Sequence, residues 1–163
     1  MRLKGNKRMS NYKPIETFDA LATQLESENI PFKRDENEPI LNIPIHLLGK
    51  ESLLQIRWEP MRGVIQFIQV MPFIVPEEQR NEVSVLINRI NFALPVLGFV
   101  LNEKKGVLTY RTQAFLNEKN AISPGLIGVM MALSIRNSEQ FLTQLQSSQP
   151  LKTNRPTSLF DLK

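Results

Sequence analysis

Few residues in this chain have side chains that could support catalysis or metal binding. His46 is the only histidine, and there is no cysteine. The lack of cysteine excludes disulfides, thiolate metal sites and thiol nucleophiles. A catalytic triad or a histidine-based metal site needs further partners at recognisable spacings, and none accompanies His46. We therefore expect His46 to be a partly exposed, non-catalytic residue.

Two pairs of carboxylates resemble acid–base dyads or the ligands of a hard cation. Glu77 and Glu78 fall in the first turn of an expected helix, where the helix dipole favours anions. Glu36 and Glu38 fall in the charged, proline-bounded segment "KRDENEP". Both locations have ordinary structural explanations, and the sequence contains no phosphate-binding, dinucleotide-binding or calcium-binding motif. The sequence therefore predicts that the protein is not an enzyme and that it needs no cofactor or metal.

Two further features have counterparts in nucleic-acid-binding proteins. Gly125 and Gly128 match the GxxG spacing of KH-type RNA binders, but they open an apolar helix rather than a basic loop. We expect close helix packing to explain both glycines. Trp58 and Phe67 could stack on bases, yet both share a strand phase with apolar neighbours, which favours burial in the core.

The positive charge of the chain is concentrated in its terminal segments. The formal net charge is +4, of which residues 1–14 carry +5 and residues 147–163 carry +2, so residues 15–146 carry −3. A phosphate-binding groove on the body is therefore not implied. We expect both terminal segments to be flexible. The candidate contacts to an anionic partner are Arg2, Lys4, Lys7, Arg8 and Lys13.

Apolar spacing predicts three main helices that would position these residues. The first covers residues 14–30, and the second follows Pro76 and continues to residue 94. The third begins at a Ser123 cap, and its residues 126–133 are apolar on nearly every side, so we expect that helix to be buried. The stretch from Ser138 to Leu145 is expected to add another short turn or two of helix.

A two-residue alternation of apolar side chains predicts the strands. Three strands joined by short turns are expected at residues 40–48, 52–59 and 64–73, with a fourth if residues 32–35 pair. Pro44 suggests an edge strand or a bulge. Two more strands, at 96–103 and 106–112, would form a hairpin that turns at Gly106.

These elements predict one α+β domain over residues 15–146. The order is helix, three to four strands, helix, two strands, helix, which gives a mostly antiparallel sheet of five or six strands with helices packed on it. No window approaches the length of an apolar membrane span, so the expected location is the cytoplasm.

The strand that begins at Val64 is apolar in both of its phases, which distinguishes it from the other predicted strands. Val64, Ile68 and Val70 occupy the phase opposite Phe67. Such a strand needs cover on both faces of its sheet, either from a second helix layer or from a partner. The candidate protein-binding surface consists of Val64, Ile68, Val70, Trp58 and Phe73.

The stretch "VPEEQRNEVSVLINRINFALPVLGFVLNEKKGVLTYRTQ", together with the order of elements, resembles the YbjN-domain family of bacterial sensory-transduction regulators. The similarity covers about residues 18 to 145. Its features are a helix start at Val75-Pro76, a helix end near Asn88 and Asn91, then Gly98-Phe99 and a hairpin closing on Tyr110-Arg111. The resemblance implies a fold related to type III secretion chaperones. It also implies a non-enzymatic module, often dimeric, that binds other proteins.

Three functions are compatible with these observations. The first is a cytoplasmic, chaperone-like adaptor that binds a segment of a protein client in assembly or stress response. The alternative is a nucleic-acid-associated regulator that uses its basic N-terminal arm, and an enzyme ranks last.

Asn91 is expected to cap the helix end or to bond across the turn, not to bind a ligand.

Overall fold

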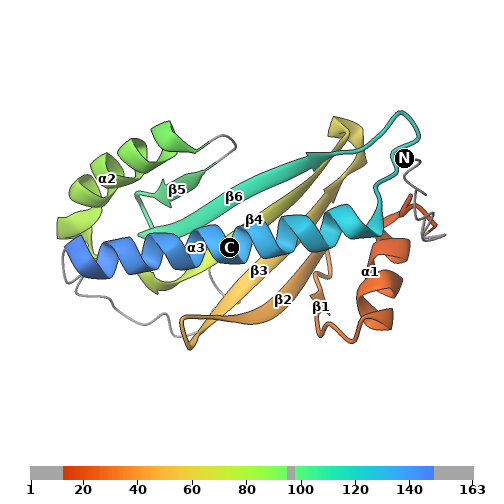
Figure 1. Ribbon diagram of the computed structural model, residues 1–163, viewed down its shortest axis with the longest axis horizontal. Coiled ribbons are helices and arrows are strands. Elements are labelled where there is room, and N and C mark those ends of the chain that lie inside the picture. The colour runs from red at the N-terminus through yellow and green to blue at the C-terminus, as the bar shows by residue number, and fades with distance from the viewer. Residues whose placement is uncertain (1–12, 95–97, 149–163) are drawn as a thin grey trace, which may run out of the picture.

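The computed structural model describes residues 13–94 and 98–148, and its elements follow the predicted order (Figure 1). The helices are α1 (Phe18–Ser27), α2 (Arg80–Ala93) and α3 (Pro124–Ser148), with short 3₁₀ helices η1 (Pro60–Arg62) and η2 (Glu77–Gln79). The strands are β1 (Lys33–Arg34), β2 (Ile40–Leu47), β3 (Lys50–Glu59), β4 (Val64–Ile74), β5 (Phe99–Asn102) and β6 (Val107–Phe115). The α+β prediction is confirmed.

The strands form one six-stranded antiparallel sheet in the order β1-β2-β3-β4-β6-β5. The short strand β1 confirms the conditional prediction of a fourth strand before α2. It pairs only with Leu41 and Asn42 of β2, so no strand of the described residues adjoins the outer side of β2 at Pro44. A residue without an N–H group is tolerated there because no neighbouring strand needs its donor.

All three helices pack on one face of the sheet, with α3 running across it and α1 and α2 at opposite ends (Figure 1). One buried cluster joins α1 and the start of α3 to the sheet around Ile56 and Phe67. A second cluster joins α2 and the end of α3 to the sheet around Phe73, where Phe99 stacks on Phe141 at 4.2 Å between ring centroids. The core therefore lies between the sheet and this helical layer.

The C-terminal helix differs from its prediction in length and in burial. It runs unbroken to Ser148, so the stretch from Ser138 to Leu145 is part of the same helix. Ser134 and Ser138 are buried in it, and Ser134 Oγ donates to the Met130 carbonyl at 2.9 Å. The expectation of burial on every side is wrong, since Val129 is 60% exposed. Close packing at Gly125 and Gly128 is also wrong, because a Cβ added at either position meets nothing within 4 Å. As an outer layer, α3 leaves one side uncovered.

Helix and hairpin boundaries follow local capping. Helix α1 begins at Phe18 and not at Pro14, because Thr17 Oγ1 accepts the Ala20 N–H at 3.1 Å and caps the helix. Ser123 Oγ accepts the Leu126 N–H at 3.3 Å, which confirms the predicted cap. Gly106 has φ +69°, the left-handed conformation predicted for the β5–β6 hairpin.

Asn91 of α2 bonds across the turn to the edge strand β5, as the sequence predicts. Its Nδ2 donates to the Phe99 carbonyl at 2.9 Å, and its Oδ1 accepts the Phe99 N–H at 2.7 Å. The amide thus takes the place of a neighbouring strand for one residue of the sheet edge. A Cβ at Gly98 would lie 2.0 Å from Asn91 Oδ1, so this close approach requires glycine.

Within residues 13–94 and 98–148, no helix combines the length and the apolar character needed to cross a bilayer.

Candidate functional site: the helix-free face of the sheet

Strand alternation gives the sheet two faces with different surroundings. On β3, Leu54 and Ile56 point into the helix-covered core, so Gln55 and Arg57 point to the opposite face. We call the latter the helix-free face, because none of the described helices packs on it. Cover for this face of β4 was expected from either a second helix layer or a partner, and the described residues supply no such helix layer.

The five predicted protein-binding residues do not share one surface. Val64, Ile68 and Val70 lie on the helix-free face, paired with Phe115, Arg111 and Thr109 of β6. Trp58 and Phe73 instead belong to the buried clusters under the helices. Both share the strand phase of Phe67, which the helices cover, and they are therefore removed from the candidate surface.

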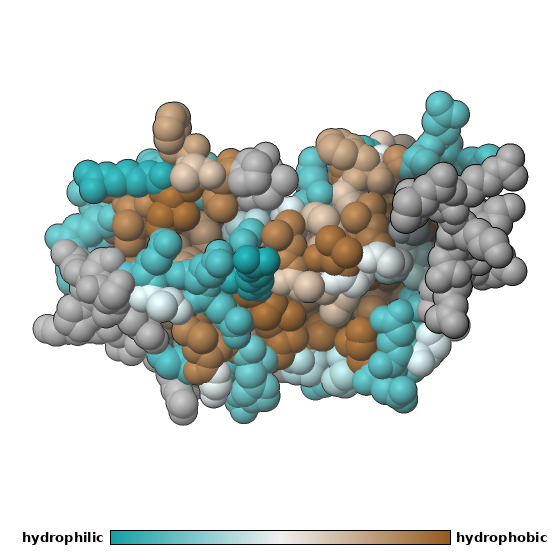
Figure 2. Space-filling model, in the orientation of Figure 1, coloured by the Kyte–Doolittle hydropathy of each residue, from teal (hydrophilic) through white to brown (hydrophobic). Residues whose placement is uncertain are grey.

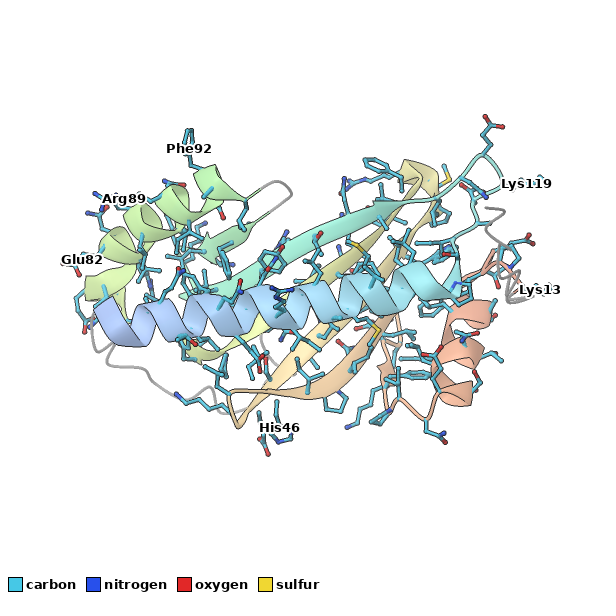
Figure 3. The ribbon with its side chains drawn as sticks, viewed as in Figure 1. Lys13, His46, Glu82, Arg89, Phe92 and Lys119 are labelled. Atoms are coloured by element: carbon cyan, nitrogen blue, oxygen red, sulfur yellow. The ribbon has the colours of Figure 1, made fainter. Side chains whose placement is uncertain are left out.

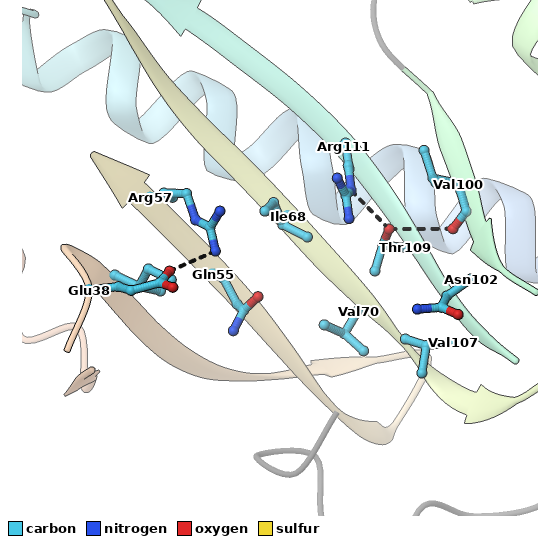
Figure 4. A pocket seen from close by; sticks show the side chains of 11 residues that line it. Glu38, Gln55, Arg57, Ile68, Val70, Val100, Asn102, Val107, Thr109 and Arg111 are labelled. Atoms are coloured by element: carbon cyan, nitrogen blue, oxygen red, sulfur yellow. Dashed lines mark hydrogen bonds and ion pairs between the residues drawn. The ribbon is translucent and has the colours of Figure 1, made fainter. Parts of the chain in front are cut away.

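A groove of about 510 Å³ runs across the helix-free face (Figure 4). Apolar side chains line its floor: Ile40, Ile68, Val70, Val100 and Val107. Polar side chains complete its lining: Glu38, Gln55, Arg57, Asn102, Thr109 and Arg111. This mixed lining can receive both the apolar side chains and the polar or charged groups of a peptide.

The two arginines of the groove differ in their partners. Arg57 Nη2 lies 2.9 Å from Glu38 Oε2, and its Nη1 lies 3.8 Å from Glu59. Arg111 Nε donates to Thr109 Oγ1 at 3.3 Å, and within the described residues no carboxylate pairs with it. Ile68 lies between the two guanidinium groups (Figure 4). The groove therefore suits an apolar ligand that also carries a negative charge.

The side chains first considered for catalysis lie apart from one another. His46 is exposed near the end of β2, opposite Glu51 in the register (Figure 3). Glu77 and Glu78 are exposed in η2, and Glu36 is exposed in the loop before β2, whereas Glu38 pairs with Arg57. In the described ranges, no group of three or more His, Asp or Glu side chains is arranged to hold a metal ion.

Only one of the predicted anion contacts falls within the described residues. Lys13 is exposed at the start of the described chain (Figure 3). The other four, Arg2, Lys4, Lys7 and Arg8, lie outside the described residues.

The helix-covered side of the molecule carries a second set of exposed apolar residues. Figure 2 shows hydrophobic surface over the first half of α3, where Leu126 and Val129 are exposed. Phe92 of α2 points outward on the same side (Figure 3). Neither the groove of the helix-free face nor the pocket beside Lys13 and α1 is lined by these three side chains. They form an outer surface, whereas the helix-free face forms a groove.

Sequence reasoning missed the polar residues of the groove. Gln55 and Arg57 alternate with core residues, so they read as ordinary solvent-facing positions. Their neighbour across the sheet, Arg111, comes from β6 through the pairing of Ile68 with Arg111. The strand order that creates this pairing cannot be read from the sequence. The only signal in the sequence was that these polar residues, like Ile68, occupy the phase opposite the core-facing residues of their strands.

Comparisons with known proteins agree with this architecture. The model of the YbjN family, described as "Putative bacterial sensory transduction regulator", matches residues 17–147. The crystal structure of YbjN from E. coli, described as "a putative transcription regulator", matches with a TM-score of 0.69 at 13% sequence identity. The match covers 87% of this chain and 100% of that chain. At this identity the likeness shows a shared fold. No curated protein sequence matches the chain.

Proposed function

The chain belongs to the YbjN family, and we propose that it is a non-enzymatic regulator that binds a segment of a client protein in the groove of the helix-free face. A chaperone-like adaptor in the cytoplasm is the form of this function that the residues favour. The observation that carries the proposal is the groove itself, with its apolar floor and its polar lining. A protein segment with alternating apolar side chains and a carboxylate fits that lining.

The sheet edges support binding to the face over binding to an edge. Peptides often add a strand to an exposed edge, where main-chain groups are unpaired. At the β5 edge, both main-chain groups of Phe99 are already bonded to the side chain of Asn91. At the other edge, β1 has only two residues, and the stretch of β2 beyond it contains Pro44, which has no N–H to donate. An added strand would therefore have few main-chain partners, whereas the groove offers several side chains to a ligand.

The test compares capture of partners by the full chain and by two matched variants. Ile68→Lys places a third cation between Arg57 and Arg111, whereas Val85→Lys changes an exposed apolar residue of α2 on the other side of the molecule. Partners bound in the groove should be lost with Ile68→Lys and kept with Val85→Lys, both variants being folded by circular dichroism. Retention with Ile68→Lys, equal loss with both variants, or the capture of no partner by the unchanged chain would contradict the proposal.

The segregation of charge supports a second candidate function, association with nucleic acid. Residues 1–14 carry +5 against −3 for residues 15–146. Binding through this arm should weaken steeply with salt, because each phosphate contact releases a counterion. It should also disappear when the five cations of the arm are replaced by glutamine. Binding that survives this replacement would exclude the arm as the contact.

A homodimer belongs to the same set of proposals. The outer side of α3 exposes Leu126 and Val129, and a second copy could cover both residues. Val129→Lys should then shift a dimer toward monomer in sedimentation equilibrium without changing groove binding. A strictly monomeric unchanged chain at high concentration would exclude this dimer.

A further inference from the structure

The floor of the groove is shielded from water, although none of the described helices packs on it. Ile68, Val70 and Val107 expose only 6%, 4% and 7% of their surface, although the described helices pack on the opposite face. Val70 and Val107 form a buried cluster of their own with Leu53. A sheet face without a covering layer ordinarily exposes such side chains to water. These side chains are therefore shielded from water on the side of the sheet that the described helices leave free.

We propose that the chain's own C-terminal segment, residues 149–163, covers this floor and that its apolar portion Leu159-Phe160-Asp161-Leu162 binds the groove. The family model ends at residue 147, so this segment is a feature of this chain outside the family match. Docking of the segment stands on its own observations. Competition with a client, described below, rests on the proposed function.

The end of α3 delivers the chain to the correct end of the sheet. Leu145 belongs to the same buried cluster as Phe73 and Val75. The Val75 N–H donates to the Gly106 carbonyl at 2.8 Å, directly before Val107 of the groove floor. A chain that leaves α3 after Ser148 therefore needs only to pass around this end of the sheet to reach the groove.

The length of the segment is sufficient for that path. Residues 149–163 follow the last described residue, and an extended chain of this length spans roughly 50 Å. Ten residues, 149–158, separate α3 from the apolar portion, and they give a spacer of roughly 30 Å that can pass around the sheet. Pro150 and Pro156 lie in this spacer and disfavour continuation of the helix.

The chemistry of the segment complements the groove. In an extended segment, Phe160 and Leu162 point to one side, where the apolar floor would receive them. Asp161 is the only acidic residue after residue 147, and Arg111 has no carboxylate partner among the described residues. An ion pair between Asp161 and Arg111 would fix the direction of the segment. A client segment should then resemble it, with apolar residues on both sides of a carboxylate.

The lack of cysteine allows a direct test in the full chain. Gln55→Cys places a thiol in the groove, and Ser158→Cys or Leu159→Cys places one in the segment, in opposite strand phases. Gln140→Cys is the matched control, because Gln140 is exposed on α3 and closer in sequence to the segment. A freely moving segment would therefore react with residue 140 at least as readily as with residue 55.

We expect an intramolecular disulfide from residue 55 to one of the two segment positions, at least tenfold faster than from residue 140 at high dilution. Arg111→Glu should reduce that rate, and Arg111→Glu combined with Asp161→Arg should restore it. Equal rates at 55 and 140, faster reaction at 140, or no disulfide at 55 would overturn the docking. A rate of disulfide formation that neither Arg111→Glu nor its combination with Asp161→Arg changes would overturn the ion pair between Asp161 and Arg111.

Competition is tested separately, with Phe160→Ser and Leu162→Ser together in the full chain. This variant should bind a groove client at least several-fold more tightly, because the intramolecular competitor is weakened. Unchanged client affinity would overturn competition while the disulfide result still decides docking. Loss of client binding by Ile68→Lys, in turn, tests the client site without reference to the segment.

Discussion

Replacing Asn91 with alanine should destabilise the protein by about 2 kcal/mol by unpairing one residue of the sheet edge. Two hydrogen bonds, of 2.9 and 2.7 Å, join the Asn91 amide to the carbonyl and the N–H of Phe99. Each bond contributes a net ~0.5–1.5 kcal/mol, and a buried group left unpaired costs about 1–3 kcal/mol. Asn91 itself is half-buried, so water can reach part of the vacated space. Two groups left unpaired would together cost about 2–6 kcal/mol if both stayed buried, so the expected loss lies near the lower end, at about 2 kcal/mol.

The assay is equilibrium unfolding in urea, with Asn88→Ala as control. Asn88 is exposed on the same helix, and the change to alanine has the same effect on helix propensity. With a slope of roughly 1–3 kcal/mol per M, the Asn91→Ala midpoint should fall by about 1 M relative to the control. The Phe99 amide should also lose protection from hydrogen exchange. A difference below about 0.5 kcal/mol, with that protection unchanged, would refute the assignment of Asn91 as the cover of this edge.

Three further predictions concern the core and the hairpin. Thr112→Val should stabilise the protein by ~1 kcal/mol in urea unfolding, because the buried Thr112 Oγ1 has no hydrogen-bond partner among the described residues; a loss of stability would reveal a partner. Burial raises the pKa of Tyr110 above 10.0, although the hydrogen bond from Asn137 lowers it. The phenol of the unfolded chain therefore loses its proton at a lower pH than that of the folded chain, so the stability should fall as the pH rises above 10.0. The fall should be smaller for Tyr110→Phe, which has no phenol proton at this position. Gly106→Ala should cost more stability than Gly49→Ala, since both have positive φ but only at Gly106 would the new Cβ lie 2.3 Å from the Val75 carbonyl; equal costs would contradict this steric reason.

Sequence patterns predicted the structure correctly where its cause lies within a few neighbouring residues. Gly106 turns the hairpin because of its own backbone freedom, and Ser123 caps α3 because its hydroxyl reaches the Leu126 N–H. The two-residue period placed the strands because one face of the sheet is buried over its whole width. The same period placed Val64, Ile68 and Val70 on one face, since the phase of a strand follows directly from its sequence.

Local rules failed where the cause is tertiary. The residues after Ser138 suggested only another short turn or two of helix, but they continue α3 without a break, with Ser134 and Ser138 buried. Apolar residues 126–133 suggested complete burial, yet a helix in an outer layer leaves one side exposed. The site required the same kind of information, because the pairing of β4 with β6 places Arg111 beside Ile68.

The energetics of the groove favour a cover that can be exchanged. Burying an aliphatic or aromatic side chain contributes roughly 1.5–3 kcal/mol, so Phe160 and Leu162 would together contribute about 3–6 kcal/mol when docked. Ordering each backbone residue costs roughly 1–2 kcal/mol, so fixing the four residues from Leu159 to Leu162 costs about 4–8 kcal/mol. The two sums nearly cancel, and the ion pair and the burial of the floor then decide the balance. A client that presents the same side chains from a better-ordered segment would lose less entropy on binding, and it would therefore displace the intramolecular segment without any change in the sheet.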